Sequence, residues 1–112
     1  MRSAPQLSIV IPAYNEAKRI SRTLETLRKY LEGTNWTAEV IVVNDGSSDE
    51  TAAIVESYRD QWNALRLIEN GRNRGKGFSV RNGALRAQGD VVLFTDADLS
   101  APITEAPKLI DP

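Results

Sequence analysis

Four short apolar runs, rich in β-branched residues, alternate along the chain with segments of helical pattern, and this alternation restricts the fold more than any other feature. The runs occupy residues 7–12, 39–43, 65–69 and 91–94. Short apolar runs bounded by proline, glycine or asparagine are typical of buried strands. Strands that alternate with helices form a parallel sheet with right-handed crossovers and helices on both faces. The sequence therefore predicts an α/β fold of three layers, α/β/α, with a mostly parallel sheet and the order β-α-β-α-β-α-β.

The first segment between the runs carries the apolar spacing of an amphipathic helix. Ile20, Leu24, Leu27 and Leu31 fall on one stripe of such a helix, and charged residues lie off it. A glycine just after the last turn is a common helix end, so we expect this helix to end at Gly33.

The second and third segments also predict helices, with specific residues at their ends. Ser47 stands three residues before Glu50, a spacing that predicts a capping box at the start of the second helix. The apolar positions of that helix are Ile54, Val55, Tyr58 and Trp62. We expect a third helix to run from about Phe78 to a C-terminal glycine cap at Gly89.

Length and charge limit the classes of protein. A chain of 112 residues with 41% hydrophobic residues has room for one domain with a modest core. Lysine and arginine total 14 and aspartate and glutamate total 15, so the net charge of -1 predicts no general attraction to nucleic acid. Positive charge nevertheless gathers between residues 66 and 86, where Glu69 is the one acidic residue. An anionic ligand would therefore be held locally.

Missing residue types limit the chemistry. The sequence has no cysteine and no histidine, which excludes disulfides, thiolate nucleophiles, Cys/His zinc sites and histidine bases within these residues. Any metal must bind through oxygen. No apolar run approaches the roughly 20 residues of a transmembrane helix, and residues 1–12 lack a signal-peptide pattern. We expect a cytoplasmic location, or the cytoplasmic face of a membrane if these residues belong to a longer protein.

Asp96 and Asp98 follow the last strand and are separated by one residue. In an extended segment residues two apart point the same way, so both carboxylates face one point at the end of the sheet. Like charges this close repel unless a cation lies beside them, and hard carboxylate oxygens suit Mg²⁺ or Mn²⁺. The pair predicts a divalent metal site that substrate phosphates complete. The alternative is that the two aspartates cap the following turn.

The glycine-rich segment 70–77 follows the third strand. It is not a Walker loop, because three residues rather than four separate Gly71 from Gly75, and Gly77 follows Lys76 where Ser or Thr is needed. No G-x-G-x-x-G follows the first strand, as a Rossmann dinucleotide site would require. What remains is a helix N-terminus with Lys76 beside it, able to hold an anion, or else an ordinary flexible turn.

The loops at the carboxyl ends of the strands match a known family when they are taken together. The stretches "LSIVIPAYNEAKRI", "VIVVNDGSSDET" and "NRGKGFSVRNGALRAQGDVVLFTDADLS" resemble, in order and spacing, the inverting GT-A glycosyltransferases of family 2, and within them the polyprenyl- and dolichyl-phosphate β-glucosyltransferases. The resemblance runs from residue 7 to about 109. It implies the Rossmann-like GT-A fold of nucleotide-diphospho-sugar transferases. Because the family's catalytic domain is longer, it also implies that residues 1–112 are the N-terminal, donor-binding part of a truncated domain.

The resemblance assigns a nucleoside-binding role to residues of the first two loops. Pro12, Tyr14 and Glu16 match residues that line the nucleoside pocket, and Asp45 matches the aspartate that reads the base. One departure is visible, because Asn44 stands where the family usually has the first of two aspartates. An asparagine keeps an acceptor oxygen but loses the charge.

On the diphosphate side, Asp96 and Asp98 match the D-x-D pair that holds Mg²⁺ or Mn²⁺ on the donor, and Lys76 is expected beside them. The implied reaction transfers a hexose to a polyprenyl (dolichyl) phosphate with inversion. Glucose from UDP-glucose is the preferred interpretation of the donor, and a donor of the GDP-mannose type is the other. A phosphate acceptor is already ionised at neutral pH, so it needs positioning more than a general base. The catalytic residues and membrane attachment are expected in the family's C-terminal half.

Other interpretations remain beside this one. Residues 1–112 alone can form a nucleotide-binding fragment or interaction module without turnover. A receiver-type signalling domain fits less well, because its acidic pair follows the first strand, where Glu16 stands alone. The last predicted strand leaves an apolar sheet edge exposed, so we expect this piece by itself to be marginally stable or to pair as a homodimer.

Overall fold

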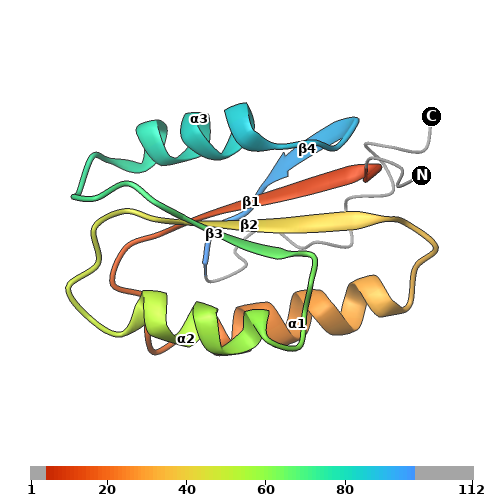
Figure 1. Ribbon diagram of the computed structural model, residues 1–112, viewed down its shortest axis with the longest axis horizontal. Helices are drawn as coiled ribbons and strands as arrows, with labels where there is room; N and C mark the ends of the chain where they lie inside the picture. The colour runs from red at the N-terminus through yellow and green to blue at the C-terminus, as the bar shows by residue number, and fades with distance from the viewer. Residues whose placement is uncertain (1–4, 98–112) are drawn as a thin grey trace.

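The computed structural model describes residues 5–97, and its elements follow the predicted alternation of strand and helix (Figure 1). The strands are β1 (Leu7–Ala13), β2 (Ala38–Asn44), β3 (Leu65–Glu69) and β4 (Val91–Phe94). The helices are α1 (Ile20–Glu32), α2 (Thr51–Arg59) and α3 (Lys76–Arg86). All strand pairs are parallel and the order across the sheet is β3-β2-β1-β4. The predicted α/β class with a parallel sheet is confirmed.

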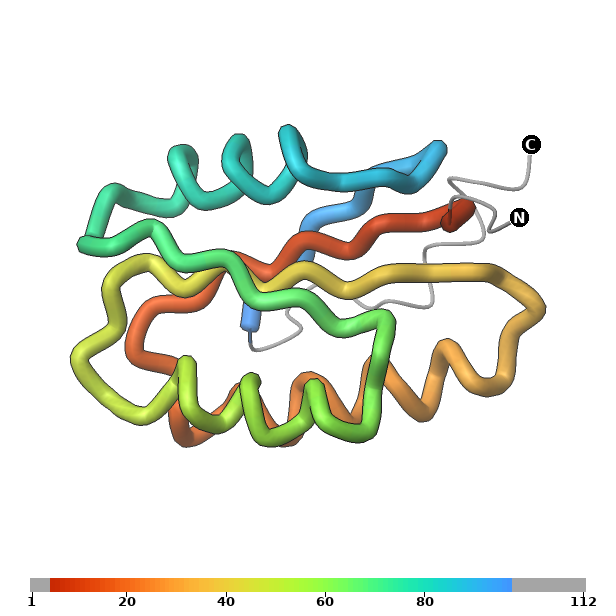
Figure 2. The backbone as a smooth tube through the Cα atoms, viewed as in Figure 1, coloured from red at the N-terminus to blue at the C-terminus, as the bar shows by residue number. Residues whose placement is uncertain are grey.

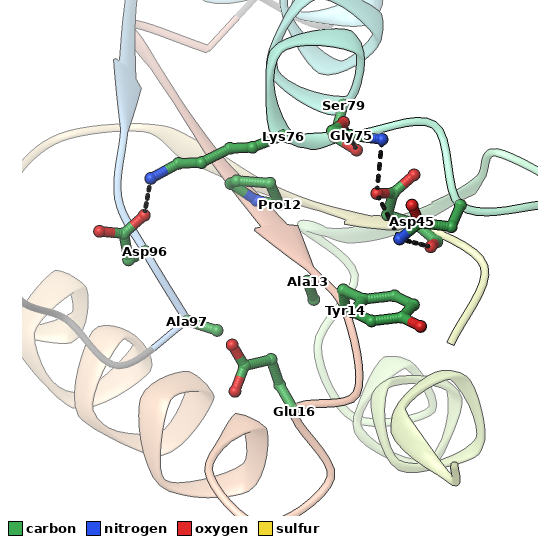
Figure 3. Close-up of a pocket in the computed structure, with 11 residues that line it drawn as sticks. Pro12, Ala13, Tyr14, Glu16, Asp45, Gly75, Lys76, Ser79, Asp96 and Ala97 are labelled. Atoms are coloured by element: carbon green, nitrogen blue, oxygen red, sulfur yellow. Dashed lines mark hydrogen bonds and ion pairs between the residues drawn. The ribbon is translucent and has the colours of Figure 1, made fainter. Parts of the chain in front are cut away.

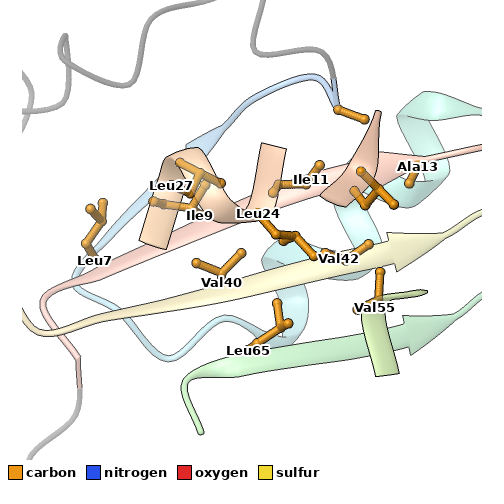
Figure 4. Close-up of a cluster of buried hydrophobic side chains, with 12 residues drawn as sticks. Leu7, Ile9, Ile11, Ala13, Leu24, Leu27, Val40, Val42, Val55 and Leu65 are labelled. Atoms are coloured by element: carbon orange, nitrogen blue, oxygen red, sulfur yellow. The ribbon is translucent and has the colours of Figure 1, made fainter. Parts of the chain in front are cut away.

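Helices cover both faces of the sheet. α1 and α2 lie on one face and α3 on the other, so the domain has three layers (Figures 1 and 2). Successive strand residues point to opposite faces. Leu7, Ile9 and Ile11 of β1 therefore belong to the larger buried cluster, with α1 and α2 (Figure 4). Val10 points the other way, toward α3, and Ile41 of β2 shares that smaller cluster.

The amphipathic stripe of α1 forms as predicted. Ile20, Leu24 and Leu27 are fully buried, and Leu31 packs against the same cluster at its margin. Burying each of these side chains contributes about 1.5 to 3 kcal/mol. The helix ends at Gly33, which confirms the predicted C-terminus.

The predicted capping box at the start of α2 is wrong. The Ser47 hydroxyl accepts a hydrogen bond from the Asn15 N–H at 2.9 Å and so joins two loops. Glu50 is at the N-cap, and its side chain makes no capping hydrogen bond. Asp49, one residue earlier, binds the first residue of the helix, because its Oδ1 accepts from the Thr51 N–H at 3.0 Å. Its Oδ2 accepts from the Ala17 N–H at 3.1 Å, which ties this loop to the start of α1 as well.

Two other predicted helix ends are also wrong. α3 ends at Arg86, and Gly89 lies beyond it, where the Gly89 N–H donates to the Ser8 hydroxyl at 2.8 Å. A Cβ on Gly89 would lie 2.7 Å from the Ser8 nitrogen, so close approach to β1 explains this glycine. α2 ends at Arg59, and Trp62 lies in the following turn, where it still packs against the core.

The register of the strands brings their carboxyl ends to one edge of the sheet. Ala13 pairs with Asn44, and Asn44 pairs with Glu69. β4 continues this alignment, because the Thr95 N–H donates to the Val10 carbonyl at 3.1 Å. The loops that follow all four strands therefore lie close together.

The described sheet has β3 and β4 at its edges. Phe94 at the end of β4 is 49% exposed. None of the helices within residues 5–97 is long and apolar enough to cross a membrane.

Candidate functional site

An open pocket of about 380 Å³ lies at the carboxyl edge of the sheet, beside the start of α3 (Figure 3). Six of the residues predicted to form a site line it: Pro12, Tyr14, Glu16, Asp45, Lys76 and Asp96. The seventh, Asp98, lies outside the described residues. The pocket is also lined by residues that were not among the predicted site residues, namely Ala13, Asn73, Gly75, Ser79 and Ala97.

The loop after β1 forms one wall of the pocket. Tyr14 is 48% exposed, and its ring lies between Glu16 and Asp45 in Figure 3. Asn15 bends the chain here with a φ of 53°, and its side-chain oxygen accepts from the Ser48 N–H at 2.8 Å. The Glu16 N–H donates to the Thr51 hydroxyl at 2.9 Å, so the loop is fastened to the start of α2. The wall is therefore held in place by the loop after β2.

Asp45 immediately follows β2, and its carboxylate is surrounded by hydrogen-bond donors from the loop before α3. The residue is 4% exposed. Its Oδ1 accepts from the Arg74 N–H at 2.7 Å and the Asn70 amide at 2.9 Å. Its Oδ2 accepts from the Gly75 N–H at 3.0 Å and, at the longer distance of 3.3 Å, from the Asn73 amide. Asp45 thus joins the end of β2 to the start of α3.

These donors decide the charge of Asp45. Burial raises the pKa of its carboxyl group, but hydrogen bonds from the Arg74 N–H, the Asn70 amide and the Gly75 N–H outweigh burial and hold the pKa below its ordinary value. Donors that favour the charged form keep the carboxyl group ionised. A negative charge is therefore fixed at the pocket wall at neutral pH.

Asn70 connects Asp45 to the body of α3. Its side-chain amide donates to Asp45 and also to the Ser79 hydroxyl, at 2.9 Å in both cases. Its side-chain oxygen accepts from the Asn82 amide at 2.9 Å. In residues 5–97 no buried side-chain nitrogen or oxygen is left without a hydrogen-bond partner, as expected of a specific polar network.

Gly46 lets the loops after β2 and β3 interlock. Its φ is 72°, and a Cβ there would lie 2.3 Å from the Asn73 nitrogen and 2.4 Å from the Arg72 carbonyl carbon. Backbone cannot give way as the end of a flexible side chain can, so a larger residue at this position would push the two loops apart.

The neighbourhood of Asn44 explains its departure from the family pattern. Asn44 is 4% exposed, and its amide donates to the Glu69 carboxylate at 2.7 Å across the β2–β3 pair. Its side-chain oxygen accepts from the Ser47 N–H at 3.3 Å. An aspartate in its place would set a second carboxylate against Glu69, whereas the amide supplies the donor that Glu69 needs.

Lys76 and Asp96 face each other across the other side of the pocket. The Lys76 ammonium lies 2.5 Å from Asp96 Oδ1, and both side chains are exposed (Figure 3). The Asp96 carboxylate is a hard oxygen ligand of the kind that suits Mg²⁺ or Mn²⁺, and its Oδ1 is paired with the Lys76 ammonium. No group of three or more acidic residues gathers anywhere in the described part of the chain. Asp96 supplies one carboxylate, and its predicted partner Asp98 lies outside the described residues.

Sequence reasoning missed Asn70, Asn73 and Ser79, because it weighed only the glycine spacing and Lys76 in this segment. The signal was nevertheless present, since asparagine recurs at positions 70, 73 and 82 around the start of a helix. Asparagine both donates and accepts, so such a cluster indicates a polar network rather than a flexible turn.

Solved glycosyltransferase structures share this fold. The mannosyltransferase PcManGT from Pyrobaculum calidifontis, in complex with GDP-Man and Mn²⁺, matches with a TM-score of 0.77 and 29% identity over 92% of this chain and 30% of that chain. S. aureus TarS 1–349, in complex with UDP-GlcNAc, matches with a TM-score of 0.76 and 33% identity over 95% of this chain and 31% of that chain. The fold is therefore GT-A-like.

Sequence comparison gives the family. The pattern of Glycosyl transferase family 2 matches residues 8–112. The dolichyl-phosphate beta-glucosyltransferase of Drosophila melanogaster is 42% identical over 93% of this chain and 34% of its own length. This chain belongs to glycosyl transferase family 2, as its loops predicted. It spans about a third of the length of the curated relatives that it matches.

Proposed function

We propose that residues 1–112 form the donor-binding region of an inverting hexosyltransferase that transfers glucose from UDP-glucose to a dolichyl-type polyprenyl phosphate. One observation carries the proposal: the fixed negative charge of Asp45 and the Lys76–Asp96 pair lie on opposite sides of one pocket. Such a pocket suits a ligand with a polar base at one end and a diphosphate at the other. The relatives' activity and the nucleotide sugars in the matching structures support the same choice.

The nucleoside is assigned to the side of Tyr14, Glu16 and Asp45, beside Pro12. The exposed Tyr14 ring offers an apolar face, and the Asp45 carboxylate offers acceptor oxygens to the N–H groups of a base. Asn73 makes the longest of the bonds to that carboxylate, at 3.3 Å. A base N–H that replaces the Asn73 amide would leave the closer bonds of Asp45 intact.

The diphosphate is assigned to the side of Lys76 and Asp96. Asp96, together with Asp98, would hold Mg²⁺ or Mn²⁺, and the ion would supply charge neutralisation on the leaving diphosphate. Lys76 and the N-terminus of α3 add positive potential on the same side. Lys76 and the N-terminus of α3 would therefore attract an anion locally, although the net charge of the whole chain is only -1.

The acceptor phosphate would attack the anomeric carbon from the side opposite the diphosphate, which gives inversion. It is ionised at neutral pH and needs positioning rather than deprotonation. We assign the groups that position it, and any attachment to the cytoplasmic face of a membrane, to the part of the relatives' length that this chain does not span.

The test uses the protein expressed from its complete gene, incubated with dolichyl phosphate, Mn²⁺ and either labelled UDP-glucose or GDP-mannose. We expect a dolichyl-linked product with UDP-glucose and none after chelation of the metal. Asp96→Asn should abolish the metal-dependent binding of donor with little change in stability, because this carboxylate is exposed. Asp60→Asn, at an exposed carboxylate after α2, is the matched control. Absence of product with every sugar nucleotide contradicts the proposal.

Residues 1–112 by themselves are proposed to bind nucleotide weakly and not to turn over. The pocket is open to water, and glycosyl transfer needs the donor enclosed. Calorimetry with UDP and Mn²⁺ measures the binding, and light scattering shows whether the exposed edge at Phe94 pairs two copies as a homodimer. A stable monomer that transfers sugar would contradict both expectations.

A further inference from the structure

We propose that Asn70 is a positioning residue of the donor site, which acts through the Asp45 carboxylate on the backbone that leads into α3. Asn70 does not line the pocket and matches none of the motif residues that imply a role. The inference rests on the proposed function, because it assigns Asn70 to the binding of the same nucleotide.

The first step is the contact between Asp45 and the start of α3. The carboxylate accepts from the N–H groups of Arg74 and Gly75 at 2.7 and 3.0 Å. These are the last two residues before α3 begins at Lys76. Asp45 therefore holds the backbone just before the helix, from the loop after β2, and it fixes where the Lys76 side chain leaves the backbone.

The second step is the orientation of Asn70, which is determined on every side. Its backbone N–H donates to the Asn44 carbonyl at 3.0 Å, which extends the β2–β3 pairing by one residue. Its side-chain oxygen is taken by Asn82, and its amide hydrogens are taken by Ser79 and Asp45. Since both ends of the amide have partners, a flipped amide would lose its bonds to the Asp45 carboxylate and from the Asn82 amide.

The third step is the effect on the nucleotide. Asp45 forms no salt bridge with a lysine or arginine in residues 5–97, so neutral donors alone hold its carboxylate in the pocket wall. Without the Asn70 amide, Oδ1 would keep only the Arg74 N–H among these donors, and the carboxylate would be able to turn. A rotated Asp45 carboxylate would present different oxygen positions to the base. It would also loosen the backbone before Lys76 and so displace the Lys76 side chain.

The decisive variant is Asn70→Asp, which keeps the shape of the side chain and replaces its donor with a carboxylate. The new carboxylate would face Asp45 Oδ1, which the native amide approaches to 2.9 Å. Two carboxylates at that distance repel when both are ionised and form a hydrogen bond when they share a proton. The defect should therefore depend on pH, whereas a loss of packing would not.

The experiment measures the dissociation constants of UDP and of GDP with Mn²⁺, from pH 8 to pH 5, for the protein expressed from its complete gene. The quantity compared is the ratio of variant to parent, so that the titration of the nucleotide itself cancels. We expect Asn70→Asp to weaken binding about tenfold to a hundredfold at pH 8, and the ratio to return toward one as the pH falls. Asn63→Asp, on the exposed turn before β3, is the matched control and should keep a ratio of one.

A second variant, Asn70→Ala, decides the question even if Asn70→Asp does not fold. It should weaken UDP binding at every pH and accelerate hydrogen exchange at the Arg74 and Gly75 amides. Parent-like exchange and affinity in Asn70→Ala, or a defect in a folded Asn70→Asp that is equal at all pH values, overturns the assignment. Failure of the parent protein to bind either UDP or GDP is a different result, because it contradicts the proposed function and not the role of Asn70 within the loop.

Discussion

Two buried carboxylates lie at opposite ends of β2, and each fastens one end of α3 to the sheet. Asp45 holds the backbone before Lys76, and Glu39 accepts from the Gln88 N–H at 2.6 Å, just beyond the last turn. Asp45 is 4% exposed and Glu39 is 6% exposed. For Glu39 too, burial raises the pKa, but hydrogen bonds from Ser8, Gln88 and Arg66 outweigh burial and hold the pKa below its ordinary value. Both groups are therefore ionised in the folded protein.

The partners of the two carboxylates differ in kind. Glu39 accepts from the Ser8 hydroxyl at 2.6 Å and pairs with the Arg66 guanidinium at 2.8 Å, and Arg66 also donates to the Arg86 carbonyl. This cluster neutralises its own charge. Asp45 has neutral donors and lines the pocket. A buried carboxylate thus joins the helix to the sheet at both ends. Only Asp45, which has no arginine partner of the kind that Glu39 has in Arg66, presents negative charge to a ligand.

The largest expected effect on stability comes from removing Glu39, which fastens the C-terminal end of α3 and does not line the pocket. Glu39→Ala removes the acceptor of three donors and leaves Arg66 without its carboxylate, so we expect the free energy of unfolding to fall by about 2 to 3 kcal/mol. UDP affinity of the folded variant should be unchanged. Urea unfolding measures the first quantity and calorimetry the second.

The matched control is Glu56→Ala, which removes an exposed ion pair with Arg59. An exposed pair contributes at most about 1 kcal/mol. A Glu39→Ala variant that is no less stable than Glu56→Ala would show that the Glu39 carboxylate does not fasten the end of α3 to the sheet.

A smaller effect is expected from the middle of α3, where the helix touches the sheet. A Cβ on Gly83 would lie 2.4 Å from Val10 Cγ1 and 3.1 Å from Val43 Cγ2. Both valines are fully buried and β-branched, so they cannot turn aside. Gly83→Ala should therefore cost about 1 to 3 kcal/mol in urea unfolding. A cost near zero would mean that α3 can lift from the sheet while its ends stay fastened.

Much of the fold could be predicted because its signals are local. The apolar runs gave β3 and β4 with their observed bounds, and the stripe from Ile20 to Leu27 gave the buried face of α1. These two steps need only the periodicity of a segment. Tyr14 and Asp45 were predicted through the resemblance to family 2, and they line one pocket with Asp96 because the carboxyl ends of the parallel strands lie at one edge of the sheet.

The errors came from side chains whose partners are distant in sequence. Ser47 suits a capping box, but its hydroxyl accepts from the N–H of Asn15, which lies 32 residues earlier in the chain. Gly89 has the composition of a helix cap, yet β1 requires it, because Ser8 lies against it. The recurring asparagines indicate a polar network around Asn70 but do not identify Asp45 as its partner, since that contact depends on the pairing of β2 with β3.

Acid should weaken both ends of α3, because the pKa values of Glu39 and Asp45 are lowered in the folded protein. A lowered pKa contributes stability that is present above the ordinary values of about 4.3 and 3.9, and that stability is lost as the pH falls through the folded values. Urea unfolding from pH 7 to pH 3 should thus show a fall in the free energy of unfolding that begins below about pH 5. Glu39→Gln should reduce that fall, and an acid profile identical to the parent would contradict the role of Glu39.

The smallest expected effect is a gain, and it comes from the first turn of α3. No heavy atom of the described residues outside the local helix lies within 4 Å of a Cβ built on Gly77. Alanine restricts the unfolded chain and favours the helix, so Gly77→Ala should stabilise the protein by about 0.5 kcal/mol in the same urea assay. Gly77 and Gly83 lie in one helix and receive the same substitution, so opposite signs would show that contact with Val10 decides the outcome. A loss of stability in Gly77→Ala would instead indicate that the start of α3 has no room for a methyl group at this position.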